Sequence, residues 1–182
     1  MNDQSLIDSL IKRSGDITFS FIALVAAFPI FVLLAFLVKL SSAGPIFYIQ
    51  ERVGRHYCRF GCIKFRTMHS EADSMLDKLL ERDLSLKSEF EKDFKLRNDP
   101  RITPIGRFLR LSSLDELPQF FNVLMGDMSI VGPRPVVQEE LKRYGVHMKE
   151  VASVRPGITG LWQVSGRNNL TYKRRVILDL LY

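Results

Sequence analysis

Cysteine and histidine are scarce in this chain of 182 residues. It has two cysteines, Cys58 and Cys62, and three histidines, His56, His69 and His147. No further cysteine completes a metal-ligand set, and a secreted disulfide framework usually has more of them. We therefore expect two reduced thiols, as in a cytoplasmic protein, and histidines that lie on the surface outside any catalytic site.

The common phosphate-binding and hydrolytic motifs are absent. The sequence has no G-x-x-x-x-G-K-[ST], G-x-G-x-x-G, H-E-x-x-H or G-x-S-x-G, which excludes the signatures of P-loop, dinucleotide-binding, zinc metalloprotease and α/β-hydrolase sites. Any catalysis by this chain would have to depend on carboxylates and cations.

The net charge is +6, although only 25% of the residues are charged. An excess of cations favours anionic partners such as phosphates, nucleic acid or an acidic membrane surface. Residues 95–110 hold five cations and one acid, which indicates either a solvated basic face or a site for phosphate or lipid headgroups. Aromatic residues are not interleaved with these cations, so nucleic acid is not the expected partner.

Charge is missing altogether from residues 17–38. As a helix this segment would be roughly 33 Å long, which matches the hydrocarbon thickness of a bilayer. It is too long for a cleaved signal peptide, and the acidic Asp3, Asp8 and Asp16 before it are wrong for one. We therefore predict a membrane-associated helix over residues 1–40, with Lys12 and Asp16 four residues apart as a solvated interfacial pair.

Pro29, which follows Phe28, lies near the middle of this apolar segment. A proline inside a helix removes a backbone hydrogen bond and kinks the helix. Cations flank both ends of the segment, so the positive-inside bias gives only a weak orientation. From the residues alone, a re-entrant helix and a straight spanning helix both stay open.

The rest of the chain predicts an α+β fold that is mainly helical. Residues 46–68 alternate apolar and polar residues, as short strands joined by tight turns do. Amphipathic periodicity predicts one helix or a broken pair over residues 71–95 and another helix near 136–150. Pro104 suits a first helical turn. The sequence also ends at residue 182 inside a helical pattern, which indicates a truncated C-terminus.

Asp115 and Glu116 are adjacent carboxylates in an otherwise basic chain, with Arg110 before them and Arg134 after them. The sequence Ser-Leu-Asp-Glu from Ser113 predicts a capping box at the start of a helix that runs to residue 126. In that interpretation the acids stabilise a helix N-terminus. A catalytic pair is the alternative. The Gly-, Pro- and Arg-rich loops at 131–135 and 155–169 would present amides and guanidinium groups to anions.

Several motifs occur in a family-specific order. They are KRSGD (12–16), GPIFYIQERVG (44–54), IKFRTM (63–68), DPRITPIGRFLR (99–110), SSLDELPQFFNVLMGDMSIVGPRP (112–135) and RPGITGLWQVSGR (155–167). Together they resemble the bacterial sugar transferase family, the monotopic polyprenyl-phosphate phosphoglycosyl transferases, and within it the undecaprenyl-phosphate galactose phosphotransferase type. The resemblance covers nearly the whole chain from residue 12.

The resemblance implies transfer of a sugar-1-phosphate from a UDP-sugar to undecaprenyl phosphate, with release of UMP, as the first membrane step of O-antigen, capsule or exopolysaccharide assembly. It implies that Asp115 is the nucleophile, that Glu116 is linked to a required Mg²⁺, and that galactose is favoured over glucose. It also implies a re-entrant helix at the bacterial inner membrane, kinked at Pro29, where Phe28 replaces the serine usual in the family.

In this interpretation, residues 1–40 form the membrane-embedded helix, and residues 41–182 form a small cytoplasmic catalytic domain with short strands and amphipathic interfacial helices. Lys64, Arg110 and Arg134 are the candidates for binding phosphate, with Pro133 and Pro135 stiffening the loop of Arg134. A second copy of the chain and downstream glycosyltransferases stay open as partners. The alternative function is a non-catalytic, membrane-anchored basic module that binds anionic lipid.

Overall fold

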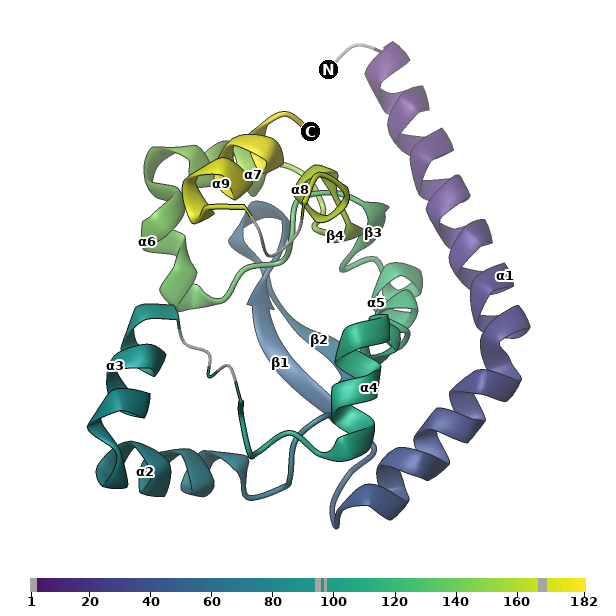
Figure 1. Cartoon of the computed structure of the whole chain (residues 1–182). Coiled ribbons are helices and arrows are strands. Elements are labelled where there is room, and N and C mark those ends of the chain that lie inside the picture. The colour runs from purple at the N-terminus through teal and green to yellow at the C-terminus, as the bar shows by residue number, and fades with distance from the viewer. Residues whose placement is uncertain (1–2, 94–95, 97, 167–169) are drawn as a thin grey trace. The chain divides into compact units, whose positions relative to one another are not determined.

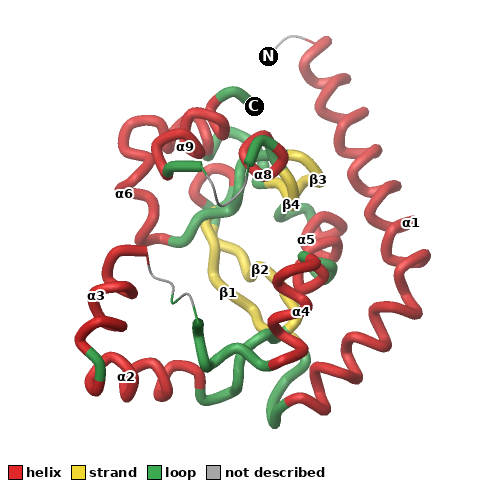
Figure 2. The backbone as a smooth tube through the Cα atoms, in the orientation of Figure 1, coloured by secondary structure: helices red, strands yellow, loops and turns green. Residues whose placement is uncertain are grey.

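The computed structural model describes residues 3–93, 96, 98–166 and 170–182 (Figure 1). Helices make up most of it, with a few short strands (Figure 2). This confirms the predicted α+β class with mainly helical content. Residues 167–169, at the end of one predicted anion-binding loop, and residues 94 and 95, at the end of one predicted helix, lie outside the described residues.

The chain folds as two compact units, which are described separately below. The first contains Met1–Pro29, Ile49–Lys64 and Pro118–Tyr182, and the second contains Ile30–Tyr48 and Phe65–Leu117. The functional division between residues 1–40 and 41–182 stays a prediction.

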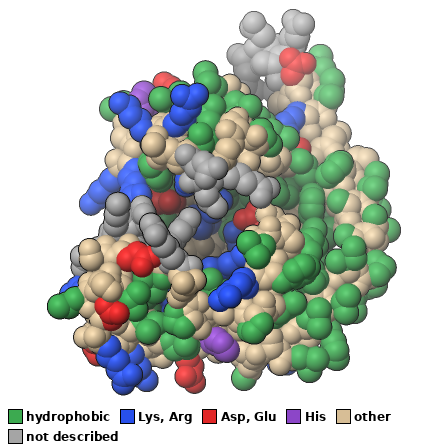
Figure 3. Space-filling model, in the orientation of Figure 1, with side chains coloured by type: hydrophobic (Ala, Val, Ile, Leu, Met, Phe, Trp, Pro, Cys, Tyr) green, Lys and Arg blue, Asp and Glu red, His purple; other side chains and the backbone are tan. Residues whose placement is uncertain are grey.

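Helix α1 (Asp3–Ser41) contains the whole uncharged segment and continues through Pro29. Its part from Ile7 to Ser41 contains an 18-residue window with a mean hydropathy of 3.0, and it is long and apolar enough to cross a membrane by length and composition. Only 11% of that apolar window is buried, and apolar side chains gather along this helix in Figure 3. A core helix would be buried, so α1 has the surface of a lipid-facing helix. The predicted kink at Phe28 and Pro29 stays a prediction.

In the first unit, strands β1 (Phe47–Val53) and β2 (Arg59–Phe65), whose outermost residues belong to the second unit, pair and are joined by a 3₁₀ turn, η1 (Arg55–Tyr57). Helix α5 (Gln119–Met125) packs on β2 through Asn122, which is fully buried. The Asn122 side chain accepts a hydrogen bond from the Ile63 amide at 3.0 Å and donates one to the Gly61 carbonyl at 2.8 Å. Because both polar atoms of the Asn122 side chain are hydrogen-bonded, this buried amide can fix the packing of α5 on β2 without leaving an unsatisfied polar group.

A second, parallel pair of strands follows α5. Strands β3 (Ser129–Val131) and β4 (Gly157–Thr159) pair Ser129 with Gly157 and Val131 with Thr159. Just beyond β3 the backbones of Gly132 and Gly157 lie in close contact. A Cβ atom on Gly157 would lie only 2.1 Å from the Gly132 nitrogen. Only glycine allows such a close approach, and it fixes the position of the loop that begins at Gly132.

The helix predicted near residues 136–150 is a series of short pieces, so this prediction of one helix is wrong. Gly145 has a φ of +55°, which a continuous helix does not allow. The pieces are η3 (Gln138–Glu140), α6 (Leu141–Tyr144), η4 (Gly145–His147) and α7 (Met148–Val151). Two further helices, α8 (Leu161–Val164) and α9 (Tyr172–Leu180), complete the unit. Its main core consists of Val53, Val136, Tyr144, Met148, Val151, Ala152 and Val176.

The second unit contains the end of α1, helices α2 (Ala72–Arg82), α3 (Leu84–Asp93) and α4 (Pro104–Ser112), and a 3₁₀ turn, η2 (Leu114–Glu116). The helical pattern over 71–95 is therefore a broken pair. The break is at Asp83, whose carboxylate accepts hydrogen bonds from the amides of Ser85 and Leu86 at the start of α3. The core of this unit is formed by Leu34, Val38, Phe65 and Leu109.

Candidate functional site

Asp115 and Glu116 lie in the tight turn η2, directly after α4, and both are half-buried. The predicted capping box is wrong. Ser113 adopts the left-handed conformation that ends α4, with a φ of 59°, and its side chain makes no capping hydrogen bond. The Glu116 amide instead donates to the Ser113 backbone carbonyl at 3.2 Å. The two acids are therefore held by a 3₁₀ turn between two helices.

Arg110, in the last turn of α4, is the cation that the second unit brings near this pair. Its Nε atom donates to the Thr67 hydroxyl at 2.9 Å. Partial burial of the guanidinium lowers its pKa, whereas the carboxylates of Asp115 and Asp99 act in the opposite direction. Arg110 thus contributes a fixed positive charge beside Asp115, although its role toward phosphate stays a prediction.

Helix α4 is fixed by contacts of its first turn. Thr103 caps it by accepting from the Gly106 amide at 3.0 Å, and Pro104 begins it, as the sequence predicts. A Cβ atom on Gly106 would lie 2.0 Å from the Thr67 carbonyl oxygen. Helix α4 therefore packs directly on the backbone of Thr67, the residue that Arg110 also binds.

Part of the basic stretch at 95–110 has a structural role that its charge did not reveal. Arg101 is 7% exposed and donates to both carboxylate oxygens of Asp99, at 2.8 and 2.7 Å. For Arg101 the solvated-face interpretation is wrong, because the side chain is buried and binds a buried carboxylate. The phosphate-site interpretation stays a prediction. Only the Asp-x-Arg spacing could have signalled this pairing.

The loop at Pro133, Arg134 and Pro135 belongs to the first unit, where both prolines are buried and Arg134 is half-buried. The Arg134 amide donates to Asp179 Oδ1 at 3.3 Å, and the Tyr144 hydroxyl donates to Asp179 Oδ2 at 2.9 Å. Asp179 is 4% exposed, and burial raises its pKa to about 6. Sequence reasoning missed Asp179, which is 45 residues from Arg134 and lies in an unremarkable helix.

Strand β1 holds the other side of the same loop. The Val53 amide donates to the Val136 carbonyl at 2.8 Å, and Arg52 Nη1 donates to the Pro135 carbonyl at 3.1 Å. Because backbone groups on both flanks are bound, the loop presents Arg134 in a fixed position.

The predicted site residues are divided between the two units. Asp115, Glu116 and Arg110 lie in the second unit, and Arg134 with its prolines and Lys64, half-buried in β2, lie in the first. Phe28 and Pro29 end the first unit's portion of α1. Each unit therefore forms its own local cluster of predicted site residues. That the two clusters act together at one centre stays a prediction.

Asp115 and Glu116 offer carboxylate oxygens, which are the ligands that Mg²⁺ takes in proteins. Among the described residues there is no group of three or more His, Cys, Asp or Glu side chains placed to hold a metal. Mg²⁺ is commonly bound by one or two carboxylates together with substrate phosphates and water. Two adjacent, half-buried carboxylates fit that pattern, so Glu116 stays the proposed ligand.

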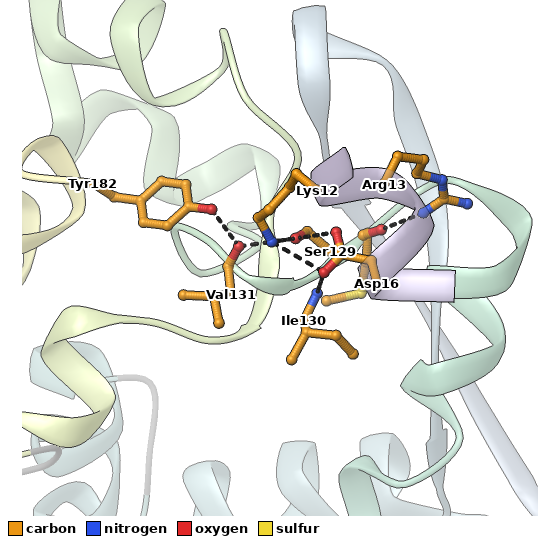
Figure 4. Close-up of polar contacts among 8 residues, drawn as sticks. Lys12, Arg13, Asp16, Ser129, Ile130, Val131 and Tyr182 are labelled. Carbon is orange, nitrogen blue, oxygen red and sulfur yellow. Dashed lines mark hydrogen bonds and ion pairs between the residues drawn. The ribbon is translucent and has the colours of Figure 1, made fainter. Parts of the chain in front are cut away.

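The N-terminal half of α1 is tied to the first unit by a polar cluster (Figure 4). Lys12 Nζ binds Asp16 Oδ1 at 3.0 Å and Ser129 Oγ at 2.8 Å, and Asp16 also accepts from the Ser129 hydroxyl at 2.7 Å and the Ile130 amide at 3.2 Å. The predicted Lys12–Asp16 pair is confirmed. It is not a solvated pair, however, because Asp16 is only 6% exposed.

Two arginines extend this attachment to the end of α5. Arg13 donates to the carbonyls of Leu124 and Met128 at 3.3 and 3.4 Å, and Arg155 donates to the carbonyl of Gly126 at 2.8 Å. Cations at a helix C-terminus bind its unpaired carbonyls and complement its dipole. The KRSGD motif therefore docks α1 onto the turn between α5 and β3.

The C-terminal end of α1 is held in the second unit by Arg66, which is 6% exposed. Its guanidinium donates to the carbonyls of Ala43 at 2.6 Å, Ser42 at 2.7 Å and Val38 at 3.4 Å. Gly44 follows with a φ of +119°, and a Cβ atom there would collide with Arg66. Both ends of the apolar helix are thus bound to polar parts of the same chain.

The structure thus combines a long apolar helix that has polar anchors at both ends, an Asp-Glu turn beside an arginine, and a rigid Pro-Arg-Pro loop. The chain belongs to the bacterial sugar transferase family, whose model matches residues 7–182.

Three relatives illustrate this similarity. The chain is 51% identical over 172 residues to the undecaprenyl-phosphate galactose phosphotransferase of Salmonella typhimurium, covering 94% of this chain and 36% of the relative. It is 46% identical over 172 residues to the UDP-galactose-lipid carrier transferase of Erwinia amylovora, covering 94% and 36%. It is 45% identical over 176 residues to the exopolysaccharide production protein ExoY of Sinorhizobium fredii, covering 97% and 78%. The chain thus spans little more than a third of the first two relatives.

Proposed function

We propose that this protein is a polyprenyl-phosphate sugar-1-phosphate transferase that moves a sugar-1-phosphate from a UDP-sugar to undecaprenyl phosphate and releases UMP. The observation that carries the proposal is the half-buried Asp115–Glu116 turn with the Arg110 charge beside it. Family membership and the names of the galactose-specific relatives support the substrate classes. We propose galactose as the sugar, with glucose as the next candidate.

The proposed reaction has two displacements at one phosphorus atom. A carboxylate oxygen of Asp115 attacks the phosphorus that bears the sugar, and the bond from that phosphorus to the UMP oxygen breaks, so that UMP leaves with the electron pair. A phosphate oxygen of undecaprenyl phosphate then attacks the same phosphorus and displaces Asp115. The product is a diphosphate-linked lipid sugar, and the carboxylate is regenerated.

The surrounding residues have separate roles in this proposal. Arg110, Lys64 and Arg134 bind phosphate oxygens, where fixed cations stabilise charge that shifts in the transition state. Glu116 would hold Mg²⁺ together with diphosphate oxygens. When bound, the ion screens the diphosphate against the incoming carboxylate and stabilises the departing UMP.

We also propose that α1 is re-entrant and that the catalytic residues lie at the cytoplasmic face of the bacterial inner membrane. The N-terminal half of α1 binds residues 124–130, and its C-terminal end binds Arg66. Among the described residues no second helix is long and apolar enough to cross a membrane. Polar segments on both sides of α1 would then share one side of the membrane, and a bend at Pro29 would allow this.

The decisive experiment is intact-mass spectrometry of the full chain with Mg²⁺ and a panel of UDP-sugars, without a lipid acceptor. We expect a gain of one phosphosugar with one donor and no gain in Asp115→Asn. An adduct that persists in Asp115→Asn would remove Asp115 as the nucleophile. Absence of an adduct with every donor, in folded protein, would contradict the covalent mechanism.

The competing function is a non-catalytic module that binds anionic lipid through the cations near α1. Its vesicle binding would fall steeply with salt and would not respond to Mg²⁺ or UDP-sugars. The mass experiment separates the two functions, because a lipid-binding module forms no adduct.

A further inference from the structure

Trp162 of α8, the only tryptophan in the chain, has two arginine neighbours. The guanidinium carbon of Arg134 lies 5.5 Å from the centre of its ring, and that of Arg175, in the first turn of α9, lies 4.9 Å from it. Trp162 is 5% exposed, so the ring is a buried support for both cations. Each distance is within the range of a cation–π contact.

Among the described residues, no salt bridge joins either guanidinium to a carboxylate. Asp179, whose pKa burial raises and the Arg134 charge lowers, accepts its hydrogen bonds from the Arg134 backbone amide and from Tyr144. Within the described residues, Arg175 Nε is also buried without a hydrogen-bond partner. An unpaired buried donor costs free energy, which a ligand can recover.

Two guanidinium groups that share one aromatic ring repel each other, because both are always charged. Stacking on the ring occupies their faces, and because both side chains are only half-buried, terminal N–H groups at their edges can meet a ligand. Guanidinium edges match phosphate oxygens in paired hydrogen bonds. A ligand with two adjacent phosphate groups would satisfy both edges and cancel the repulsion.

We propose that Arg175 binds the diphosphate of the nucleotide donor together with Arg134, with Trp162 as their common support. This proposal rests on the proposed function and adds a residue from the C-terminal helix to the donor site. The rigid loop around Arg134 and the nine-residue helix α9 hold the two arginines in place before the ligand arrives. Preorganised cations lose little side-chain entropy on binding.

The test uses UDP as the probe and the fluorescence of Trp162 as the signal. UDP is titrated, at fixed Mg²⁺ and salt concentration, into the full chain in detergent. We expect saturable binding that Arg175→Met weakens about tenfold or more, because methionine keeps the packing of the stem and removes the guanidinium. Arg175→Lys should be intermediate, since it keeps the charge and loses the paired hydrogen bonds.

The matched control is Arg174→Met, which removes the same charge from the neighbouring exposed position of α9. It should leave the affinity for UDP within about twofold. The proposal is overturned if Arg175→Met also stays within that range, or if both variants weaken binding equally, which would indicate net charge alone. If Arg175→Met does not fold, an unchanged affinity in Arg175→Lys likewise overturns it.

The outcomes also separate this inference from the function on which it rests. A wild-type adduct with normal UDP binding by Arg175→Met overturns only the role of Arg175. A wild-type chain that neither binds UDP nor forms an adduct overturns both.

Discussion

At the residue scale, Asp179 is a buried acid that holds the Pro-Arg-Pro loop in position through hydrogen bonds to its two oxygens. Its two oxygens join the Arg134 backbone to Tyr144, and so connect α9, α6 and the Pro-Arg-Pro loop. The raised pKa, about 6, reflects mainly the cost of burying the charge. Asp179 is therefore a positioning residue whose ionised form opposes folding.

The first prediction concerns stability and pH. The pKa of Asp179 is raised from 3.8 to about 6 in the folded chain, so its stabilising contribution is complete below the unfolded value and is lost as the pH rises through about 6. Asp179→Asn removes this titration. Relative to wild type, the variant should gain roughly 2–3 kcal/mol of unfolding free energy between pH 4 and pH 8.

Unfolding in detergent at several pH values measures this difference. Glu139→Gln, which removes an acid at an exposed position of the first unit, is the control. A flat difference for Asp179→Asn would mean that Asp179 titrates normally in the folded protein.

At the element scale, the sequence predicted most elements and missed the reasons for their ends. The strands at 47–65 follow from alternation, and the start of α4 at Pro104 follows from the place of proline in a first helical turn. Over residues 71–95 the periodicity left one helix or a broken pair open, and the structure has the broken pair. The series of short helices from 138 to 151 was not predicted, because Gly145 has a positive φ, which the helical periodicity of the sequence does not reveal. The capping box at Ser113 failed because α4 ends there, whereas the motif predicted a helix start.

The second prediction concerns the attachment of α1. Asp16→Ala removes the acceptor of the Ser129 hydroxyl and the Ile130 amide, and it leaves Lys12 with Ser129 but without its carboxylate partner. Unsatisfied buried groups cost about 1–3 kcal/mol each, so the midpoint of thermal unfolding should fall by roughly 5–10 °C. Asp16→Asn, which keeps an acceptor oxygen, should recover part of the loss.

Asp8→Ala is the matched control, because Asp8 is an exposed acid on the same helix. Its effect should stay within about 0.5 kcal/mol. Equal effects of Asp8→Ala and Asp16→Ala would show that the cluster in Figure 4 does not hold the helix in solution.

At the scale of the whole molecule, the sequence contains the local patterns of the proposed site and does not reveal what surrounds them. The adjacent acids and the Pro-Arg-Pro loop are local patterns that can be read from the chain. Asp179, Arg175 and the Asp99–Arg101 pair depend on contacts that sequence periodicity does not encode. The buried state of Asp16 depends in the same way on β3, more than a hundred residues away.

The third prediction concerns membrane topology. In a Cys58→Ser background, which removes the exposed thiol and leaves the buried Cys62, cysteines are placed at the exposed positions Asp8 and Ala43. If α1 is re-entrant, a membrane-impermeant maleimide should label both in inside-out vesicles and neither in spheroplasts. Labelling of one position from each side would show that α1 spans the membrane.

The anchor of α1 also has a consequence for the order of synthesis. Lys12 and Ser129 are 117 residues apart, so at about 5–20 residues per second the ribosome needs roughly 6–23 s to reach Ser129 after Lys12. During that interval the apolar helix is complete while its docking partner does not yet exist. With the proposed topology, the nascent helix enters the lipid first, and the unfinished chain stays there until the strand that binds the helix has been made.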